Sequence, residues 1–326
     1  MKKKIKTIGV LTSGGDAPGM NACVRAVVRG ALKEGLEVYG IEHGYQGMIQ
    51  GKMRKMNWKS VSGIMHQGGT ILKTARSERF RTKEGREIAY NQLRHYEIDA
   101  LVIIGGDGSF KGALEFSSEF DIPVIGCPGT IDNDIFGTDF TIGYDTAINT
   151  AMWAIDKIKD TANAHDRLFF VEVMGRDAGF IALRSGIATG AESVLVPESS
   201  TDINRLIAKL ERLYQVKQRS CIVVVAEGDE MGGAFEIAKK VGQRFDKYDI
   251  RITILGHIQR GGSPTCMDRV LASRLGLEAI RGLLDGQREV MVGKICHDIV
   301  FTPLEKAVKH HHELNPVLLD IIDILS

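Results

Sequence analysis

Short apolar segments rich in β-branched residues alternate along the chain with segments whose apolar residues recur at helical spacing. In most of the short segments nearly every position is apolar, which is typical of parallel strands buried on both faces. The predicted strands are Thr7–Thr12, Glu37–Glu42, Ala100–Gly105, Pro123–Gly126, Leu168–Val173, Ser193–Val196, Cys221–Ala226 and Arg251–Gly256. The predicted helices are Asn21–Glu34, Ser109–Phe120, Thr141–Ala162, Asp202–Tyr214 and Met267–Leu284, with Ser109 and Asp202 as N-terminal caps. This alternation predicts an α/β fold with mostly parallel, doubly wound sheets.

The glycine-rich segments of the chain follow the predicted strands. Doubly wound sheets bind ligands at the carboxyl ends of their strands, so a site is expected in these segments. The chain has 326 residues, which exceeds the usual size of one hydrophobic core and favours two domains. We expect one domain from residues 1–140 and 256–305, and the other from residues 141–255 and 306–326.

Charge and cysteine content argue against several classes of protein. A formal net charge of +1 gives no basic field that would attract nucleic acid or a membrane surface, so neither is expected as a partner. The cysteines are odd in number and scattered, and none has C-x-x-C spacing, which argues against disulfides or a zinc site and favours a reducing, cytoplasmic location. The apolar residues 8–11 are too few for a signal peptide, and no segment is long enough to span a bilayer.

The first predicted strand leads into the sequence T-S-G-G-D-A-P-G-M-N over residues 12–21, which opens a helix. The backbone N–H groups of such a loop, together with the helix N-terminus, can face an anion such as phosphate. Gly14 and Gly19 have the spacing of a P-loop, but Met20 stands where that motif requires lysine, which excludes the Walker mechanism. A tight strand-to-helix turn without a ligand is the alternative.

A second loop of this kind, I-G-G-D-G-S over residues 104–109, follows another predicted strand. Its glycines let backbone and ligand approach closely, and Asp107 adds a carboxylate. Because Mg²⁺ prefers one or two carboxylates together with phosphate oxygens, Asp107 is the candidate Mg²⁺ ligand. Several nucleotide kinase families carry G-G-D-G, and an aspartate in an exposed turn is the alternative.

The segment P-G-T-I-D-N-D over residues 128–134 places the carboxylates of Asp132 and Asp134 two residues apart after a strand. A sugar hydroxyl that attacks phosphorus must lose its proton, and phosphoryl transfer otherwise depends on positioning and on charge neutralisation. One acid as the base and the other near the metal would meet these needs. A turn formed by the side chains of Asp-Asn-Asp is the alternative.

Basic residues gather near further strand ends. Arg251 precedes the segment L-G-H-I-Q-R-G-G-S-P over residues 255–264, which adds His257 and Arg260, and these side chains could clamp a phosphate dianion. The ends of other strands carry further candidates: Arg167, Met174, Gly175, Arg176 and Glu227. Glu227 could accept hydrogen bonds from sugar hydroxyls. Each charged residue of this set could instead belong to a surface ion pair.

Taken together, these segments resemble the signature set of the bacterial 6-phosphofructokinases. In chain order they are T-S-G-G-D-A-P-G-M-N, G-G-D-G-S, P-G-T-I-D-N-D, V-M-G-R and L-G-H-I-Q-R-G-G-S-P, and the match runs from about residue 5 to residue 285. The resemblance implies a glycolytic kinase that transfers the γ-phosphoryl group of Mg·ATP to the 1-hydroxyl of fructose 6-phosphate. It also implies two Rossmann-like domains and a homotetramer whose active sites are shared between subunits.

The same resemblance implies roles for individual residues. ATP and Mg²⁺, in the first of the two domains, would be surrounded by Gly15, Tyr45, Arg76, Ser77, Asp107, Gly108 and Ser109. Fructose 6-phosphate, in the second, would be held by Thr130, Asp132, Arg167, Met174, Gly175, Arg176, Glu227, Arg251, His257 and Arg260. Asp132 would be the catalytic base, with Arg76, Thr130 and Asp134 as the other catalytic residues. Arg167 and Arg251 would reach in from a neighbouring subunit.

Three other functions remain open. A pyrophosphate-dependent phosphofructokinase would carry Asp in place of Gly108 and Lys in place of Gly129, side chains that fill space needed by the ATP α-phosphate, so the glycines favour ATP. A lipid or NAD kinase also pairs G-G-D-G with a G-T-x-N-D-like segment, but it leaves residues 257–264 unexplained. A non-catalytic sugar-phosphate sensor would have no use for Asp107, Asp132 and Arg76 together.

A regulatory anion site is only partly matched. Arg25, Arg29 and Glu192 follow the family pattern, and the two arginines lie one helical turn apart, where they can meet one anion. The remaining positions depart from the pattern: Trp58 and Lys159 replace arginines, and Val216 and Gln218 replace lysines. An alignment shifted by one residue would place Lys217 and Arg219 at the last two positions. We expect control by ADP or phosphoenolpyruvate to be weak, because effector phosphates would be under-neutralised.

Overall fold

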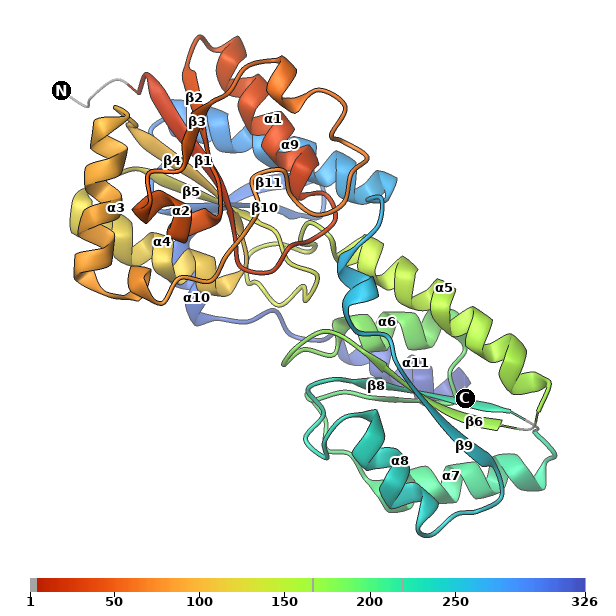
Figure 1. Cartoon of the computed structure of the whole chain (residues 1–326). Helices are drawn as coiled ribbons and strands as arrows, with labels where there is room; N and C mark the ends of the chain where they lie inside the picture. Colours follow the sequence, from red (N-terminus) through yellow and green to blue (C-terminus); the bar gives the residue numbers. More distant parts are fainter. Residues whose placement is uncertain (1–4, 166, 219, 326) are drawn as a thin grey trace. The chain divides into compact units, whose positions relative to one another are not determined.

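The structure, a computed structural model, describes residues 5–165, 167–218 and 220–325, and Arg219 lies outside these residues. The chain forms two compact units (Figure 1). The first unit comprises Met1–Ile131, Ile135–Thr146 and Arg260–His312, and the second comprises Asp132–Asp134, Ala147–Gln259 and Glu313–Ser326. The predicted assignment of ATP to one domain and of fructose 6-phosphate to the other stays a prediction.

A seven-stranded sheet in the order β11-β10-β5-β4-β1-β2-β3 organises the first unit. Its strands are β1 (Thr7–Ser13), β2 (Glu37–Ile41), β3 (Met53–Lys55), β4 (Ala100–Gly105), β5 (Val124–Pro128), β10 (Val290–Ile295) and β11 (Asp298–Pro303). The five central strands run parallel, whereas β3 and β11 pair antiparallel at the two edges. Antiparallel pairing therefore occurs only at the two edges of the sheet.

Helices cover both faces of this sheet. They are α1 (Met20–Lys33), α2 (Gly44–Ile49), α3 (Lys83–His95), α4 (Asp107–Phe120), α9 (Cys266–Leu284) and α10 (Leu304–Lys309), with the short 3₁₀ helices η1 (Lys59–Val61) and η2 (Arg79–Arg81). α1 and α9 pack on one another, as do α4 and α10 (Figure 1). Leu101 and Ile103 of β4 join the core beneath α2, α3, α4 and α10, so Val102 and Ile104 face the opposite side. Burial on both faces explains why β4 is apolar throughout.

The second unit contains a four-stranded parallel sheet in the order β7-β8-β6-β9. Its strands are β6 (Arg167–Val173), β7 (Ser193–Leu195), β8 (Cys221–Ala226) and β9 (Asp249–Ile254), and its helices are α6 (Phe180–Thr189), α7 (Ile203–Gln215), α8 (Ala234–Gly242) and α11 (Pro316–Leu325). α5 (Tyr144–Asn163) begins in the first unit, and η3 (Gly256–Arg260) ends there. Strand β8 is buried along its whole length, whereas β9 is an edge strand that is largely exposed.

The predicted α/β fold and its mostly parallel sheets are confirmed, and each predicted strand and helix is present. Asp202 caps α7 as expected, because its side chain accepts hydrogen bonds from the backbone N–H groups of Asn204 and Arg205. The prediction of Ser109 as a cap is wrong. α4 begins at Asp107 after the extended residue Gly106, since an acidic first residue suits the positive end of the helix dipole. No helix among the described residues combines the length and the apolar character needed to cross a membrane.

Candidate active site

The strand order of the first sheet reverses at β1 and β4, because the chain continues from β1 to β2 on one side and from β4 to β5 on the other. Open α/β sheets bind ligands at such a switch point. The loops that follow β1 and β4 are the two predicted phosphate loops, and they begin where Ser13 pairs with Gly105. A Cβ atom on Gly105 would lie 2.5 Å from Ser13 O and 2.6 Å from Ser109 Oγ, so glycine is needed for the two loops to approach this closely.

The first turn of α4 holds buried polar atoms that the fold leaves unused. Asp107 Oδ2 accepts a hydrogen bond of 2.7 Å from Lys111 Nζ. Asp107 Oδ1 and Ser109 Oγ are buried, and no described residue forms a hydrogen bond with either atom. A buried polar atom without a partner costs about 1–3 kcal/mol. A carboxylate oxygen in this state, at the positive end of a helix, fits a site for Mg²⁺ and phosphate oxygens.

Gly108 lies in the same turn, and the protein itself does not require glycine there. Its φ is outside the left-handed region, and a Cβ atom at this position would meet no described atom within 4 Å. Gly129 differs, because a Cβ atom there would lie 3.1 Å from Ile104 Cγ2 and 3.1 Å from Met20 Cε. The tight packing of the fold accounts for Gly129, whereas the open space beside Gly108 leaves room for a ligand.

The segment that contains Arg76 and Ser77 is bound to the first phosphate loop and to α2. Thr74 Oγ1 donates to Gly14 O at 2.6 Å, and Ser77 Oγ donates to Gln46 Oε1 at 2.7 Å. Arg76 lies between these two anchors and is exposed. The segment therefore holds an exposed guanidinium beside the first loop.

Tyr45 links α2 to the second loop. Its hydroxyl donates to Ser109 O at 2.5 Å, and its ring stacks on Phe80 with centroids 4.0 Å apart. Burial raises the pKa of Tyr45 well above the ordinary value for a phenol. Tyr45 is thus a neutral, buried support of the second loop.

Arg260 lies over the first loop. Its Nη1 donates to Asp16 O at 3.3 Å, and a Cβ atom on Gly15 would come within 2.5 Å of the same nitrogen. The predicted phosphate residue Arg260 and the predicted ATP residue Gly15 are therefore neighbours in the first unit.

Predicted sugar-phosphate residues also meet in the second unit, at the carboxyl ends of β6 and β8. Glu227 Oε1 accepts hydrogen bonds from Gly175 N at 3.3 Å and from Arg176 N at 2.7 Å. Met174 N donates to Oε1 of the fully buried Gln259 at 3.3 Å, a support that the sequence analysis did not include. Two strand ends thus bring together Met174, Gly175, Arg176 and Glu227, while His257 is exposed in η3.

Arg167 and Arg251 form a separate group. Arg167 Nε and Arg251 Nη2 both donate to Asp249 Oδ2, at 3.2 and 2.7 Å, a pairing that the sequence analysis missed. Arg167 is the first residue of β6 and Met174 follows its last, so at about 3.3 Å per residue some 23 Å separate them. Arg251 lies within β9 and not at its end, because β9 begins two residues earlier than predicted. Within one chain these arginines do not join the group around Met174.

The predicted acid cluster follows β5, and its backbone bends at residues 131–132. Thr130 and Asp132 are buried, and Asn133 between the two acids has φ 56°, a conformation that asparagine tolerates better than most residues. Thr130 O accepts a hydrogen bond of 2.6 Å from Thr141 Oγ1. The catalytic roles of Asp132 and Asp134 stay predictions, as does the alternative of a turn formed by the side chains of Asp-Asn-Asp.

The first part of the predicted effector site, on α1, departs from the family pattern at Trp58. The guanidinium of Arg29 lies 5.6 Å from the ring centroid of Trp58. Burial and the neighbouring Arg29 lower the pKa of Arg25. The tryptophan that stands in place of an arginine therefore covers one of the two matching arginines.

The second part has partners within its own unit. Lys159 Nζ donates to Thr189 O at 2.8 Å and to Gly190 O at 3.3 Å, where it caps the carboxyl end of α6. Glu192 accepts a hydrogen bond of 2.6 Å from Gln218 Nε2, and burial raises the pKa of this glutamate. The side chains of Lys159 and Glu192 therefore already form hydrogen bonds within the second unit.

Comparison with known proteins identifies the family of the chain. The family model described as phosphofructokinase matches residues 7–283. The chain is 54% identical over 322 residues, 99% of its length and 98% of the relative's, to "ATP-dependent 6-phosphofructokinase 2" of Bacteroides thetaiotaomicron. It is 52% identical to "ATP-dependent 6-phosphofructokinase 1" of Thermus thermophilus, over 99% of this chain and 100% of that protein.

Solved structures agree as well. A phosphofructokinase from Saccharomyces cerevisiae superposes with a TM-score of 0.89 at 37% identity, over 93% of this chain, which spans 45% of the yeast chain. A pyrophosphate-dependent phosphofructokinase from Marinobacter aquaeolei, 22% identical, shares the fold with a TM-score of 0.85 over 98% of this chain and 91% of that one. Because the family model matches residues 7–283 and the curated relatives are 52–54% identical over nearly the whole length, the chain belongs to the phosphofructokinase family.

Proposed function

We propose that the chain transfers the γ-phosphoryl group of ATP to the 1-hydroxyl of fructose 6-phosphate, giving fructose 1,6-bisphosphate and ADP in glycolysis. The curated relatives that cover its whole length at 52–54% identity carry the name ATP-dependent 6-phosphofructokinase. The first unit binds ATP at the switch point of its sheet, and the second binds the sugar phosphate at Met174–Arg176 and Glu227.

Gly108 is the residue that supports ATP, rather than pyrophosphate, as the phosphoryl donor. Neither φ nor packing among the described residues requires glycine there, so the open space beside it is available to the nucleotide. An aspartate, as in the pyrophosphate-dependent branch that the sequence analysis considered, would fill this space with negative charge. Gly129 adds less to the argument, because its packing against Ile104 and Met20 already demands a small residue.

The residues divide the chemistry between them. Asp132 removes the proton of the attacking 1-hydroxyl, because a hydroxyl is a poor nucleophile until it is deprotonated. Arg76, exposed beside the first loop, neutralises charge that develops on the transferred group. Asp107 would hold Mg²⁺ through Oδ1, which has no hydrogen-bond partner in the described part of the chain, and the ion would neutralise charge on the phosphate oxygens.

An assay for fructose 1,6-bisphosphate with ATP, with pyrophosphate or with neither donor tests the proposal. We expect product only when ATP and fructose 6-phosphate are both present. Turnover with pyrophosphate in place of ATP would contradict the donor, and ATP consumption without the sugar bisphosphate would contradict the acceptor.

The active form is a homotetramer with shared sites. Arg251, Ile252 and Ile254 are exposed on the edge strand β9, and an edge strand with exposed apolar side chains favours a partner. The separation of Arg167 from Met174 along β6 also requires another chain if both groups bind one substrate. Co-expression of Arg251→Ala with Asp132→Asn tests this, because mixed assemblies of two inactive chains should regain activity only if subunits share a site.

The proposed location is the cytoplasm. All cysteines are free in the part of the chain that the structure describes, as expected of a protein in a reducing compartment. Cys23, Cys127 and Cys221 are buried, so oxidants have little access to them.

A further inference from the structure

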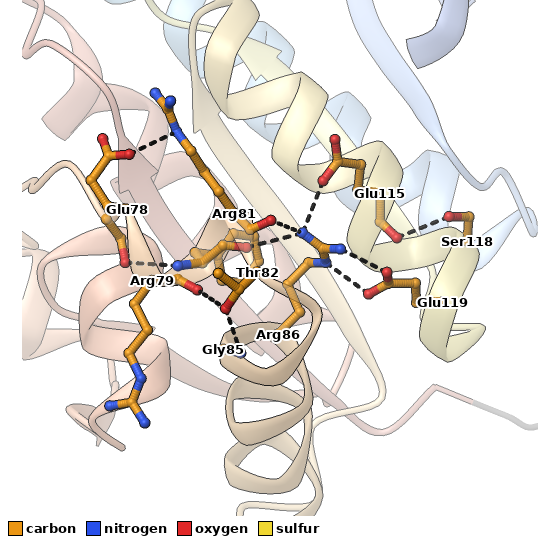
Figure 2. A network of polar contacts seen from close by, with 11 residues as sticks. Glu78, Arg79, Arg81, Thr82, Gly85, Arg86, Glu115, Ser118 and Glu119 are labelled. Carbon is orange, nitrogen blue, oxygen red and sulfur yellow. Dashed lines mark hydrogen bonds and ion pairs between the residues drawn. The ribbon is translucent and has the colours of Figure 1, made fainter.

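A buried arginine joins three elements of the first unit around the predicted ATP site (Figure 2). Arg86 lies in the first turn of α3, and its side chain is only 8% exposed. Its guanidinium forms a two-pronged contact with Glu119 of α4, from Nε to Oε2 and from Nη2 to Oε1, both at 2.7 Å. A bidentate contact of this kind fixes orientation as well as distance.

The third nitrogen of the guanidinium binds the backbone that precedes α3. Nη1 donates to Arg81 O at 2.8 Å and to Phe80 O at 3.2 Å, which are carbonyls of η2, and to Glu115 Oε2 at 2.9 Å. Figure 2 shows the guanidinium between the backbone of Arg81 and the two glutamates of α4. One side chain therefore ties η2 to α4.

Both elements adjoin or contain predicted ATP residues. η2 directly follows the segment with Arg76 and Ser77, and α4 begins with Asp107, Gly108 and Ser109. The connection continues through the rings, because Phe80 of η2 stacks on Tyr45, whose hydroxyl donates to Ser109 O. Ser77 Oγ also accepts a hydrogen bond from Phe80 N at 3.3 Å.

We propose that Arg86 is a positioning residue for ATP: by tying η2 to α4, it holds Arg76 and Ser77 in place opposite Asp107–Ser109. The inference rests on the proposed function for the identity of the nucleotide. Arg86 acts only through these neighbours. The ion pair is well matched, since Glu119 raises the pKa of Arg86 and Arg86 lowers the pKa of Glu119.

Loss of this tie should reduce the fraction of molecules in which the segment is correctly placed. The apparent affinity for a ligand falls in proportion to the competent fraction. If about one molecule in ten keeps the segment in place, the KM for ATP rises about tenfold. The KM for fructose 6-phosphate should not change, because the residues predicted to bind it lie on other elements.

The experiment compares Arg86→Met, Arg86→Lys, Glu119→Gln and Glu115→Gln. Arg86→Lys keeps the charge but loses the two-pronged contact. Glu119→Gln loses one acceptor of that contact, whereas Glu115→Gln changes only the exposed partner of Nη1. We expect the KM for ATP to rise most in Arg86→Met, less in Arg86→Lys and Glu119→Gln, and little in Glu115→Gln. Arg281→Met, which breaks the exposed 2.7 Å pair between Arg281 and Glu278 on α9, is the matched control.

Amide hydrogen exchange gives a readout that does not depend on activity. In Arg86→Met, or in Arg86→Lys if the former does not fold, amides of residues 74–82 should exchange faster than in wild type while those of β1 and β4 do not. An unchanged KM for ATP together with unchanged exchange in Arg86→Lys and Glu119→Gln would overturn the inference. So would a parallel rise of both KM values that simply follows a fall in Tm. Absence of wild-type turnover with ATP would contradict the proposed function, whereas the exchange measurement would still test the tie.

Discussion

The first turn of α4 combines a buried carboxylate oxygen with an open face. Asp107 Oδ1 has no hydrogen-bond partner among the described residues, so the folded protein bears a desolvation cost that a cation can offset. Gly108 beside it faces open space, which a side chain could enter without meeting described atoms. The two residues therefore predict different outcomes: changes at Asp107 should affect the metal, and changes at Gly108 should affect the nucleotide.

Gly108→Asp should raise the KM for ATP at least about tenfold, or about 1.4 kcal/mol, and leave the KM for fructose 6-phosphate unchanged. The reason is that a carboxylate would face phosphate oxygens at short range in a partly desolvated loop. Steady-state kinetics with each substrate varied in turn measures both constants. Gly108→Ala is the control, since its methyl group meets only open space, and it should bind ATP nearly as well as wild type. Equal ATP affinity in Gly108→Asp would show that this position does not select the donor.

Asp107→Ala should increase the Mg²⁺ concentration needed for half-maximal activity and lower the maximal rate, because it removes a metal ligand. Stability should change little, since Oδ1 makes no hydrogen bond with any described residue and Oδ2 loses only its contact with the exposed Lys111. A Mg²⁺ titration and a thermal melt check the two parts. Lys111→Ala leaves the carboxylate in place and should keep the Mg²⁺ requirement. An unchanged Mg²⁺ requirement in Asp107→Ala would count against the metal assignment.

Asp132→Asn should fold and bind both substrates but lose roughly 10²–10⁴-fold in kcat, the usual cost of removing a general base. The amide has nearly the same shape as the carboxylate and cannot accept the proton of the 1-hydroxyl. Single-turnover measurements at saturating substrate separate this loss from weaker binding. A kcat within a few-fold of wild type would rule out Asp132 as the base.

At the scale of elements, the sequence predicted best those strands and helices whose burial leaves a recognisable run or spacing of apolar residues. β4 and β8 are buried on both faces and read as continuous apolar runs. β3 is short and largely exposed, so it has no such run, and α6 is apolar on nearly all sides, so helical spacing does not distinguish it. The predicted sheets therefore lacked their antiparallel edges.

The candidate site also has parts that the sequence predicted and parts that it did not. The position of the two glycine-rich loops could be predicted because glycines and a carboxylate follow a strand locally in the sequence. The contact of Arg86 with Glu119 spans 33 residues, and that of Arg167 with Asp249 spans 82. Such pairs depend on how separate elements pack and on the register between strands, which a single sequence pattern does not encode.

The start of α9 carries a buried acid that the sequence analysis did not single out. Asp268 accepts hydrogen bonds from Gly143 N and Thr146 N, both at 2.8 Å, and from Thr146 Oγ1 at 2.5 Å. Burial raises the pKa of Asp268 to about 6, although these hydrogen bonds act in the opposite direction. The acid ties the start of α5 to α9 within the first unit.

The raised pKa gives a stability prediction with a definite sign. A folded-state pKa above the unfolded value means that the contribution of Asp268 to stability is complete below about pH 4 and is lost as the pH rises through about 6, by up to about 3 kcal/mol. Asp268→Asn cannot ionise, so its destabilisation relative to wild type should shrink from pH 4.5 to pH 7. Urea unfolding at fixed protein concentration measures the difference. A difference that grows with pH would mean that the hydrogen bonds outweigh burial.

At the scale of the whole molecule, regulation requires an effector to bind two states of the protein with different affinity. The available shift is limited by that difference, usually 1–3 kcal/mol. The predicted effector residues fall in both units, with Arg25 and Arg29 in the first and Lys159 and Glu192 in the second. Several of them already have partners within their own unit: Arg29 contacts Trp58, Lys159 caps α6 and Glu192 binds Gln218. Few charges therefore remain to distinguish the two states through a bound phosphate.

We therefore predict that phosphoenolpyruvate and ADP each shift the half-saturating concentration of fructose 6-phosphate by less than about tenfold, or about 1.4 kcal/mol of coupling. Titration of each effector at sub-saturating fructose 6-phosphate measures the shift. Trp58→Arg is the matched variant, because it removes the ring over Arg29 and adds a guanidinium that can grip phosphate, so it should enlarge the response. A shift of tenfold or more in wild type would refute weak regulation and favour the alignment that places Lys217 and Arg219 at the effector positions. A small wild-type shift that Trp58→Arg increases would instead identify the missing cation as the reason for weak control.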